Sequence, residues 1–370
     1  MKILQLGKFY PIRGGVEKVM WNLTRGISAR GISCDMLCAC LKADIPEGGE
    51  IRMNDFGRVI CVPAPVKAAA TMLSPAMICW LRRHCGEYDI IHVHHPDPMA
   101  ALALWLSGYK GRVILHWHSD ILKQKLLLKF YKPLQSWLIR RAEKIVGTSP
   151  VYPAQSPYLQ KVQDKVTFVP IGVEPVRFDK EAAAALRAQY PGKKIIFSLG
   201  RLVGYKGYKY LVEAASLLPD DYVVIIGGEG PLRGELEAQI ETLGLQEKVF
   251  LKGYLEREAL SAWYGACDLY VMSSIWKTEA FGIVQIEAMS CGKPVVATRI
   301  PASGVSWVNK DGFSGRNAEI ENPQSLASAI LEITSDNTIF ASYSANALKR
   351  YEELFTFDGM IDKALELYNF

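Results

Sequence analysis

Residues 267–299 read CDLYVMSSIWKTEAFGIVQIEAMSCGKPVVATR. Two short apolar runs, CDLYVMSS and KPVVATR, flank a helix-period segment, GIVQIEAMSCG, that ends at Gly292. Polar residues, glycine or proline bound each apolar run, as is typical of buried strands. The stretch therefore predicts a strand, a helix and a second strand, which is the unit that builds parallel sheets.

Similar apolar runs alternate with helix-period segments along the whole chain. They are KILQLG, RVICVPA, DIIHVHH, RVILHWH and KIVGTSP in the first half, and KIIFSLG, YVVIIGG and KVFLKGY in the second. Because 370 residues exceed what one hydrophobic core usually serves, we expect two α/β domains, each with a parallel sheet. Ligands bind beyond the carboxyl ends of such strands, so we expect the ligand in a cleft between the two sheets.

The predicted domain boundaries follow this series of strands. Residues 1–170 form the first domain and residues 171–352 the second, with the join in the proline-punctuated stretch VTFVPIGVEPVRF at 166–178. Residues 353–370 are expected to form a C-terminal helix that packs back on the first domain.

The composition excludes several classes of protein. With 49% hydrophobic and 22% charged residues, the chain is typical of a folded protein. It has no run of eighteen apolar residues, and the apolar stretch near Met1 is too short for a signal peptide or an anchor. The eight cysteines contain no Cys-x-x-Cys pair and are interpreted as reduced core thiols, so a cytoplasmic protein is expected.

Positive charge is concentrated in the first half of the chain. Residues 1–170 hold 23 Lys and Arg against 12 Asp and Glu, whereas the remaining 200 residues hold 20 against 26. Seven of the basic residues lie in ILKQKLLLKFYKPLQSWLIRRAEK, residues 121–144, among apolar side chains. Such a segment either binds an anionic membrane surface or is a solvated helix face, and both interpretations stay open. No nucleic-acid-binding motif accompanies it, so nucleic acid is not an expected partner.

Two glutamates of the opening stretch, Glu279 and Glu287, do not share a helix face, because eight positions at about 100° per residue leave them about 80° out of register. Glu279 is predicted in the loop and Glu287 in the second turn of the helix, so the pair brackets a helix N-terminus. The unpaired N–H groups of a helix N-terminus favour a phosphate or another anion. Acids around a bound phosphate suit sugar and ribose hydroxyls, and the segment predicts a nucleotide-sugar site.

Cations for the phosphates are expected in GRLVGYKG, residues 200–207, directly after the predicted strand KIIFSL. Arg201 and Lys206 lie in this strand-to-helix loop, where a guanidinium and an ammonium neutralise a diphosphate. The alternative is that they are two ordinary surface cations. The next loop, GGEGPL at 227–232, has glycines that let a backbone approach a ligand closely, but its spacing does not fit a dinucleotide fingerprint.

These segments together with EAFGIVQIEAMSCGKPVVAT, residues 279–298, resemble the retaining glycosyltransferases of family 4, which have the two-domain GT-B fold. The resemblance extends over nearly the whole chain, including GKFYPIRGGVEKVM at 7–20. It implies two Rossmann-like parallel-sheet domains that face each other across a deep cleft. It also implies a nucleotide-sugar donor, and neither a metal ion nor another cofactor.

The resemblance implies a role for each matching residue of this sequence. Arg201 and Lys206 hold the donor diphosphate, Glu279 lies beside the donor sugar, and Glu287 binds the ribose. The resemblance places His118 near the donor sugar. The implied catalytic residues are Arg201, Lys206, Glu279 and His118. The other implied donor contacts are the backbone of Gly14 and Gly15, Tyr254 beside the base, and the backbone of Phe281, Gly282, Ile283 and Val284.

Two segments depart from the family pattern. Where relatives commonly have Asn-Gly-Val-Asp, this chain has IGVE, so Ile171 cannot supply an amide contact. A later Gly-Gly followed by an acid appears only as ASGVSWV, residues 302–308, which weakens the expectation of a ligand contact there.

All six histidines fall within residues 84–118, which raises a metal-binding alternative. In strands, His92 and His94 share one face, as do His116 and His118, so their imidazoles can converge at neighbouring strand ends. The metal independence of the family argues against this alternative. For His118, a satisfied core histidine is the alternative to a residue of the active site.

The resemblance therefore implies a glycosyltransferase that moves a hexose, with retention, from a nucleotide diphosphate sugar to an acceptor hydroxyl. GDP-mannose is the favoured donor, with a UDP-hexose as the other choice, and a lipid-linked saccharide of surface polysaccharide synthesis at the inner membrane face is the expected acceptor. The rivals are a hydrolysing nucleotide-sugar epimerase of the same fold and a sugar-nucleotide-binding protein without turnover.

Overall fold

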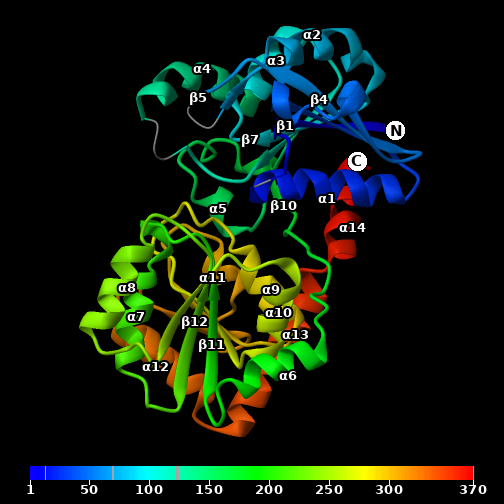
Figure 1. Cartoon of the computed structure of the whole chain (residues 1–370). Helices are drawn as coiled ribbons and strands as arrows, with labels where there is room; N and C mark the ends of the chain where they lie inside the picture. Colours follow the sequence, from blue (N-terminus) through cyan, green and yellow to red (C-terminus); the bar gives the residue numbers. More distant parts are fainter. Residues whose placement is uncertain (13, 69–70, 122–124, 370) are drawn as a thin grey trace. The chain divides into compact units, whose positions relative to one another are not determined.

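The computed structural model describes residues 1–12, 14–68, 71–121 and 125–369 (Figure 1). The chain divides into two compact units, Met1–Ile171 with Phe357–Phe370, and Gly172–Thr356. Within the second unit the segments that lead to the first run side by side, because the Val173 amide donates to the Phe355 carbonyl at 3.0 Å. The predicted helix start at residue 353 falls inside α13 (Asn337–Leu354), and the terminal helix α14 (Phe357–Tyr368) begins four residues later.

The first unit is built on an eight-stranded sheet with the order β10-β9-β8-β7-β1-β2-β4-β3. All neighbouring strands are parallel except β3 and β4. The strands are β1 (Lys2–Phe9), β2 (Ser33–Leu41), β3 (Glu50–Asn54), β4 (Gly57–Ala64), β7 (Ile90–His95), β8 (Arg112–Trp117), β9 (Lys144–Gly147) and β10 (Val166–Phe168), and a small antiparallel pair, β5 (Val66–Ala68) and β6 (Thr71–Leu73), lies apart from them.

Two helices of the first unit, α2 and α3, begin at a residue whose side chain caps them. The Ser74 hydroxyl accepts the Met77 amide ahead of α2, and the Asp97 carboxylate accepts two amides ahead of α3, each with proline as the next residue. The helices of the first unit are α1 (Gly15–Ala29), α2 (Pro75–His84), α3 (Pro98–Ser107), α4 (Lys125–Arg141), α5 (Val151–Ala154) and α14.

Helix α14 packs on α1, so the two ends of the chain lie in one unit (Figure 1). A Cβ at Gly26 of α1 would lie 2.4 Å from the Cδ1 of Ile361, so the absence of a side chain at Gly26 lets the two helices pack closely. At the end of α1, Arg30 pairs with Asp358 at 3.1 Å and also with Asp362. A glycine contact and two ion pairs therefore hold the last helix on the first.

The second unit is a six-stranded parallel sheet with the order β13-β12-β11-β14-β15-β16. Its strands are β11 (Lys194–Leu199), β12 (Tyr222–Gly227), β13 (Val249–Gly253), β14 (Leu269–Met272), β15 (Val295–Thr298) and β16 (Gly315–Ala318). Its helices are α6 (Lys180–Ala188), α7 (Tyr208–Ser216), α8 (Arg233–Thr242), α9 (Arg257–Ala266), α10 (Ile283–Ser290), α11 (Val305–Val308), α12 (Pro323–Thr334) and α13.

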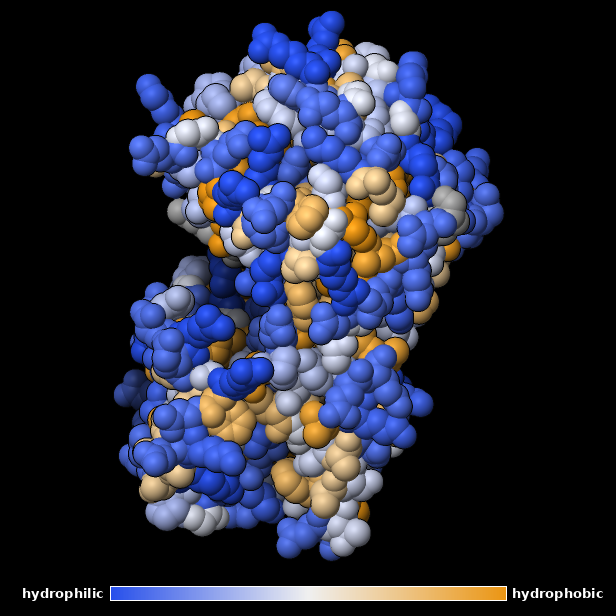
Figure 2. All heavy atoms as spheres, turned by 90° about the vertical axis from the view of Figure 1, so that its right-hand side faces the viewer, coloured by the Kyte–Doolittle hydropathy of each residue, from blue (hydrophilic) through white to orange (hydrophobic). Residues whose placement is uncertain are grey.

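The predicted α/β class, with one mainly parallel sheet in each unit, is confirmed. The face in Figure 2 is mostly hydrophilic, with small scattered apolar areas. Among the described residues, none of the helices is long and apolar enough to cross a membrane.

Candidate active site

The loops that follow β11 and β14 meet at the point where the strand order of the second unit reverses. From β11 the chain proceeds to β12 and β13 on one side, whereas β14, β15 and β16 lie on the other. Such a reversal leaves a crevice at the carboxyl ends of the two central strands, where open α/β sheets bind ligands. The two loops, residues 200–207 and 273–282, are therefore the candidate site. Both contain residues that the sequence predicts to bind a nucleotide sugar.

An ion pair joins these loops. Lys206 ends a short 3₁₀ turn, Gly204–Lys206, and its Nζ lies 2.5 Å from Oε2 of Glu279. The Ser274 hydroxyl donates to the same carboxylate oxygen at 3.2 Å. The two charged side chains are only 12% and 13% exposed, so each depends on the other for compensation of its charge.

Backbone contacts fix the separation of the two loops. The Ile275 amide donates to the Tyr205 carbonyl at 2.8 Å, and the Ser273 hydroxyl donates to the Lys206 carbonyl at 2.9 Å. Gly207 has φ +65°, and a Cβ there would lie 2.2 Å from the Ser273 carbonyl oxygen. Only glycine combines this conformation with this close approach.

The start of α10 completes the site. Gly282 is the N-cap residue, with φ +77°, and Ile283 and Val284 form the first turn, whose amides have no carbonyl of an earlier turn to bind. Phe281 is buried and packs its ring against Trp307 and Phe355. The helix start is therefore anchored in the core while its first amides remain available to an anion.

Glu287 lies one turn further along α10 and is half buried. The hydroxyl of Tyr264, a buried residue of α9, donates to its Oε2 at 2.8 Å. Burial, with the Glu287 charge as the second cause, raises the pKa of Tyr264 well above its ordinary value, so the phenol stays a donor. The glutamate is thereby held in one orientation.

Arg201 and Tyr254 differ from these residues in having exposed side chains. Among the residues that the structure describes, the Arg201 guanidinium has no hydrogen bond or ion pair, so it is free to meet a ligand anion. Its loop is fixed by its neighbour Leu202, whose amide donates to the Glu229 carbonyl at 2.9 Å. Tyr254 follows β13 and is 70% exposed, which leaves its ring accessible to a base.

Three of the predicted site residues belong to the first unit. Gly14 is the N-cap of α1 and Gly15 its first residue, and the carboxylate of Glu17 folds back over Gly14, within 2.2 Å of the place where a Cβ would stand. His118 follows β8 and is buried. Its Nε2 lies 2.9 Å from Nδ1 of His94, and its ring stacks on His116 with centroids 4.1 Å apart.

The histidines of the metal-binding alternative also come together in the first unit. Ring nitrogens of His92, His94 and His116 lie within 4.8 Å of one another, and all three residues are buried. Burial lowers the pKa of His92 and His94 well below their ordinary value, and that of His116 to about 3, so all three rings are neutral at neutral pH. Neutral imidazoles can bind a metal ion as well as hydrogen-bond to one another.

Three residues that support the site were missed by sequence reasoning. Tyr264 and Ser274 bind the two glutamates, and the Ser303 hydroxyl donates to the Glu279 carbonyl at 2.5 Å. The next amide, of Gly304, donates to the Ala280 carbonyl at 2.9 Å. Ser303 and Gly304 belong to ASGVSWV, the segment in which the expectation of a ligand contact is weakened. They stabilise the loop of Glu279 through its backbone carbonyls.

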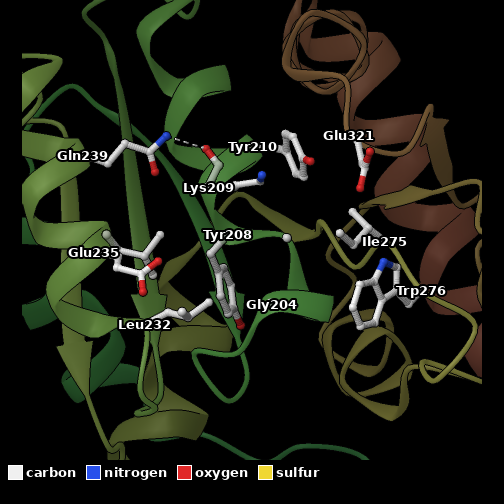
Figure 3. Close-up of a pocket in the computed structure, with 12 residues that line it drawn as sticks. Gly204, Tyr208, Lys209, Tyr210, Leu232, Glu235, Gln239, Ile275, Trp276 and Glu321 are labelled. Carbon is white, nitrogen blue, oxygen red and sulfur yellow. Dashed lines mark hydrogen bonds between the residues drawn. The ribbon is translucent and has the colours of Figure 1, made fainter. Parts of the chain in front are cut away.

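A pocket of about 540 Å³ lies next to these loops (Figure 3). Gly204 and Gly207 of the first loop, and Ile275 and Trp276 of the second, line it together with residues of α7 and α8. Arg201, Lys206 and the two glutamates are not part of its wall. These four charged residues therefore lie outside this pocket.

Comparisons with known proteins agree with this geometry. A family model described as glycosyl transferases group 1 matches residues 179–351, and one described as glycosyltransferase family 4 matches residues 13–177. The O-antigen chain mannosyltransferase C of Escherichia coli is 33% identical, over 100% of this chain and 98% of the relative. This chain belongs to glycosyltransferase family 4.

Another relative is the D-rhamnosyltransferase WbpZ of Pseudomonas aeruginosa, 30% identical over 96% of this chain and 92% of the relative. Among solved structures, sucrose-phosphate synthase from Thermosynechococcus elongatus has a TM-score of 0.80 at 20% identity, covering 100% and 98% of the two chains. HepE from Anabaena, solved in complex with UDP, has a TM-score of 0.80 at 22% identity, covering 100% and 99%. These likenesses confirm the GT-B fold of this family 4 glycosyltransferase.

Proposed function

We propose that this glycosyltransferase moves a hexose, with retention at the anomeric carbon, from a nucleotide diphosphate sugar to a hydroxyl of a lipid-linked saccharide in surface polysaccharide synthesis. GDP-mannose is the preferred donor, since the E. coli relative is named a mannosyltransferase of the O-antigen chain. A UDP-hexose is the second choice, because the structural neighbour HepE was also solved in complex with UDP-glucose.

The single observation that carries the proposal is the Lys206 and Glu279 ion pair beside the first turn of α10. A donor diphosphate would bind the ammonium of Lys206, the guanidinium of Arg201 and the free amides of Ile283 and Val284. The carboxylate of Glu279 would then accept hydrogen bonds from hydroxyls of the donor sugar. The carboxylate of Glu287 would do the same for the ribose.

The proposed reaction needs no side-chain nucleophile. The bond between the anomeric carbon and the diphosphate oxygen breaks, and its electron pair stays on the diphosphate. The acceptor oxygen forms its bond to the same face of that carbon, and its proton passes to the departing diphosphate oxygen. Arg201 and Lys206 stabilise the charge that develops on the leaving group, which is the main electrostatic contribution expected of this site.

We further propose that the enzyme works without a metal ion, because the two cations already supply positive charge at the diphosphate. His118 would contact the donor sugar, and the backbone at Gly14 and Gly15 would let the diphosphate pass closely. Tyr254 would stack on the base through its exposed ring.

The membrane part of the proposal rests on α4. Its described exposed residues include Lys129, Phe130 and Lys132, and the Phe130 ring is 80% exposed between the two lysines. Lys123 lies outside the described residues. A protruding aromatic ring flanked by ammonium groups suits the interface of an anionic membrane. We therefore propose that the enzyme lies on the cytoplasmic membrane face, where its lipid-linked acceptor is found.

A panel of GDP- and UDP-sugars, each incubated with and without a lipid-linked saccharide, tests the proposal. Transfer that requires the acceptor and gives a product with the anomeric configuration of the donor, measured by proton NMR coupling constants, is the expected result. Release of free nucleotide without an acceptor would favour the hydrolysing epimerase. Tight binding without turnover of any sugar in the panel would favour the sugar-nucleotide-binding protein, and inversion would exclude the front-face mechanism.

A further inference from the structure

Four buried histidines of the first unit lie on neighbouring strands or directly after them. β7 pairs with β8 so that His94 is opposite His116, with His92 two residues before His94 and His118 two residues after His116. Burial lowers the pKa of His118 well below its ordinary value, as it does for His92 and His94. A neutral imidazole has one N–H donor and one bare acceptor nitrogen, so each ring must choose a tautomer.

A continuous chain of buried hydrogen bonds runs from His118 to the last helix. His118 Nε2 and His94 Nδ1 are 2.9 Å apart, and His94 Nε2 lies 2.8 Å from Oε1 of Gln5 on β1. The Gln5 amide nitrogen donates to the hydroxyl of Tyr368 on α14 at 3.1 Å. That hydroxyl lies 2.6 Å from Nδ1 of His92.

The Gln5 amide gives this chain a direction. Its Oε1 can only accept, so His94 donates from Nε2 and must accept at Nδ1 from the Nε2–H of His118. Its amide nitrogen has two hydrogens, of which one reaches Tyr368 and the other points to the sulfur of Cys34 at 3.8 Å. If the amide were turned over, Oε1 would face Cys34 and Tyr368. One of the two amide hydrogens would then lose the Cys34 sulfur as its acceptor.

We propose that Gln5, His94 and Tyr368 are positioning residues that hold His118 as its Nε2–H tautomer, with Nδ1 left as a bare acceptor. The inference rests on the proposed function for what His118 meets. A bare Nδ1 accepts a hydrogen bond from a sugar hydroxyl and cannot donate one to a phosphate oxygen. The chain of hydrogen bonds would thus make His118 bind a hydroxyl of the sugar and not an oxygen of the diphosphate.

The same nitrogens fit a metal ion less well. Tetrahedral zinc holds its nitrogen ligands at about 2.0–2.1 Å, which places the ligands about 3.4 Å from one another. The nitrogens of His92, His94 and His116 spread over up to 4.8 Å, and His94 already uses both of its nitrogens in the chain. Binding a metal there would break hydrogen bonds that the apoprotein satisfies.

The tautomers can be measured directly, because the chain has only six histidines. Full-length protein labelled with ¹⁵N-histidine gives long-range nitrogen–proton correlations that distinguish Nδ1–H from Nε2–H, and the His118→Asn variant assigns His118. We expect a protonated Nε2 and a bare Nδ1 in His118 of the unaltered protein. The Gln5→Met variant, which removes the acceptor that sets the direction, should give a mixture of both tautomers.

Tyr368→Phe tests the link to the last helix. It keeps the ring and removes one hydroxyl, so kcat/KM for sugar transfer should fall about 5- to 10-fold, as for the loss of one or two buried hydrogen bonds. Tyr109→Phe is the matched control, because its buried hydroxyl donates to the Tyr88 carbonyl and takes no part in the chain of hydrogen bonds. In this variant kcat/KM should stay within about twofold of the unaltered protein. Urea unfolding of both variants separates this effect from lost stability.

Three results would overturn the inference. They are an Nδ1–H tautomer of His118 in the unaltered protein, an unchanged tautomer in Gln5→Met, and transfer by Tyr368→Phe equal to that of Tyr109→Phe. Metal-type nitrogen shifts of His94 and His116 on adding Zn²⁺ would replace the chain by a metal site. The expected tautomer without transfer from any donor would refute the proposed function and leave the chain intact.

Discussion

Lys206 and Glu279 lie 73 residues apart in the chain, and their side chains meet at 2.5 Å at the carboxyl ends of β11 and β14. Neither side chain is more than 13% exposed. A charge this buried is stable only while its partner or a ligand compensates it. Each side chain of the pair can therefore leave the other only if a ligand supplies the compensating charge.

The first prediction concerns the two cations. Arg201→Ala and Lys206→Ala each remove a charge-assisted contact that we propose to the diphosphate, and each should weaken binding of the nucleotide diphosphate by about 1.5–3 kcal/mol. Isothermal titration calorimetry with GDP and UDP measures this. Lys180→Ala, at an exposed position of α6 outside both loops, is the control. Unchanged binding in both variants would refute the diphosphate assignment.

The two glutamates should differ in kinetics. Glu287→Ala should raise the donor KM with little change in kcat, because ribose contacts are the same in the ground and transition states. Glu279→Gln should lower kcat at saturating donor, because we propose that this acid binds the sugar whose charge changes in the transition state. Steady-state kinetics with donor varied measures both parameters. The opposite pattern would mean that the two positions have exchanged roles.

Tyr264 should contribute to donor affinity without touching the donor. Tyr264→Phe removes the hydroxyl that orients Glu287, and should weaken donor binding by about 0.5–1.5 kcal/mol. Tyr351→Phe is the matched control in the same unit, because its hydroxyl donates to the Val173 carbonyl and to neither glutamate. Equal donor dissociation constants in the two variants would show that Glu287 needs no orientation.

Sedimentation with acidic liposomes tests the membrane surface. Lys129→Gln with Lys132→Gln should weaken binding by about 2 kcal/mol in total, since each cation near the surface contributes about 1 kcal/mol, and added salt should weaken the unaltered protein likewise. Phe130→Ser should add to the loss. Lys110→Gln with Lys161→Gln removes the same charge from exposed positions outside α4 and should bind normally. If the two double variants bind alike, α4 is only a solvated helix.

Stability should fall as the pH drops below about 6.5, the unfolded pKa of histidine. The buried histidines have lowered folded pKa values, so the unfolded chain binds more protons in this range and the neutral fold is fully favoured only above it. For His116, whose pKa falls to about 3, the loss is about 1.4 kcal/mol per pH unit.

Urea unfolding at pH 7.5 and pH 5 measures this dependence. His116→Phe should reduce the pH slope by about one proton, since its two ring nitrogens have no partner among the described residues and the replacement does not titrate. Ile114→Val, on the same strand, should change the free energy of unfolding without changing the slope. An unchanged slope in His116→Phe would contradict the lowered pKa.

The sequence predicted the strands that are continuous apolar runs, such as β7, β12 and β15. It did not identify β2, which reads SCDMLCACL and contains three cysteines and an aspartate, or β16, which is the polar edge strand GRNA. Residues of low strand propensity form strands there because the neighbouring strand supplies the hydrogen bonds. Such tertiary effects leave no local pattern.

The site was predicted in part for the same reason. Loop position and helix start placed Glu279 and Glu287 correctly relative to α10. Strand alternation put His92 with His94 and His116 with His118, but the pairing of His94 with His118 needs the register of β7 on β8. The support of Glu287 by Tyr264 comes from α9, and no spacing rule connects the two residues.

The discontinuous make-up of the first unit has a consequence for synthesis on the ribosome. Gln5 can form its hydrogen bond with Tyr368 only after Tyr368 has been synthesised, 363 residues later. The whole second unit is translated between Ile171 and Phe357. At about 5–20 residues per second this interval lasts roughly 10–40 s. During it, the surface of α1 around Gly26 that Ile361 will cover is bare, so a nascent chain at this stage is a natural client for chaperones.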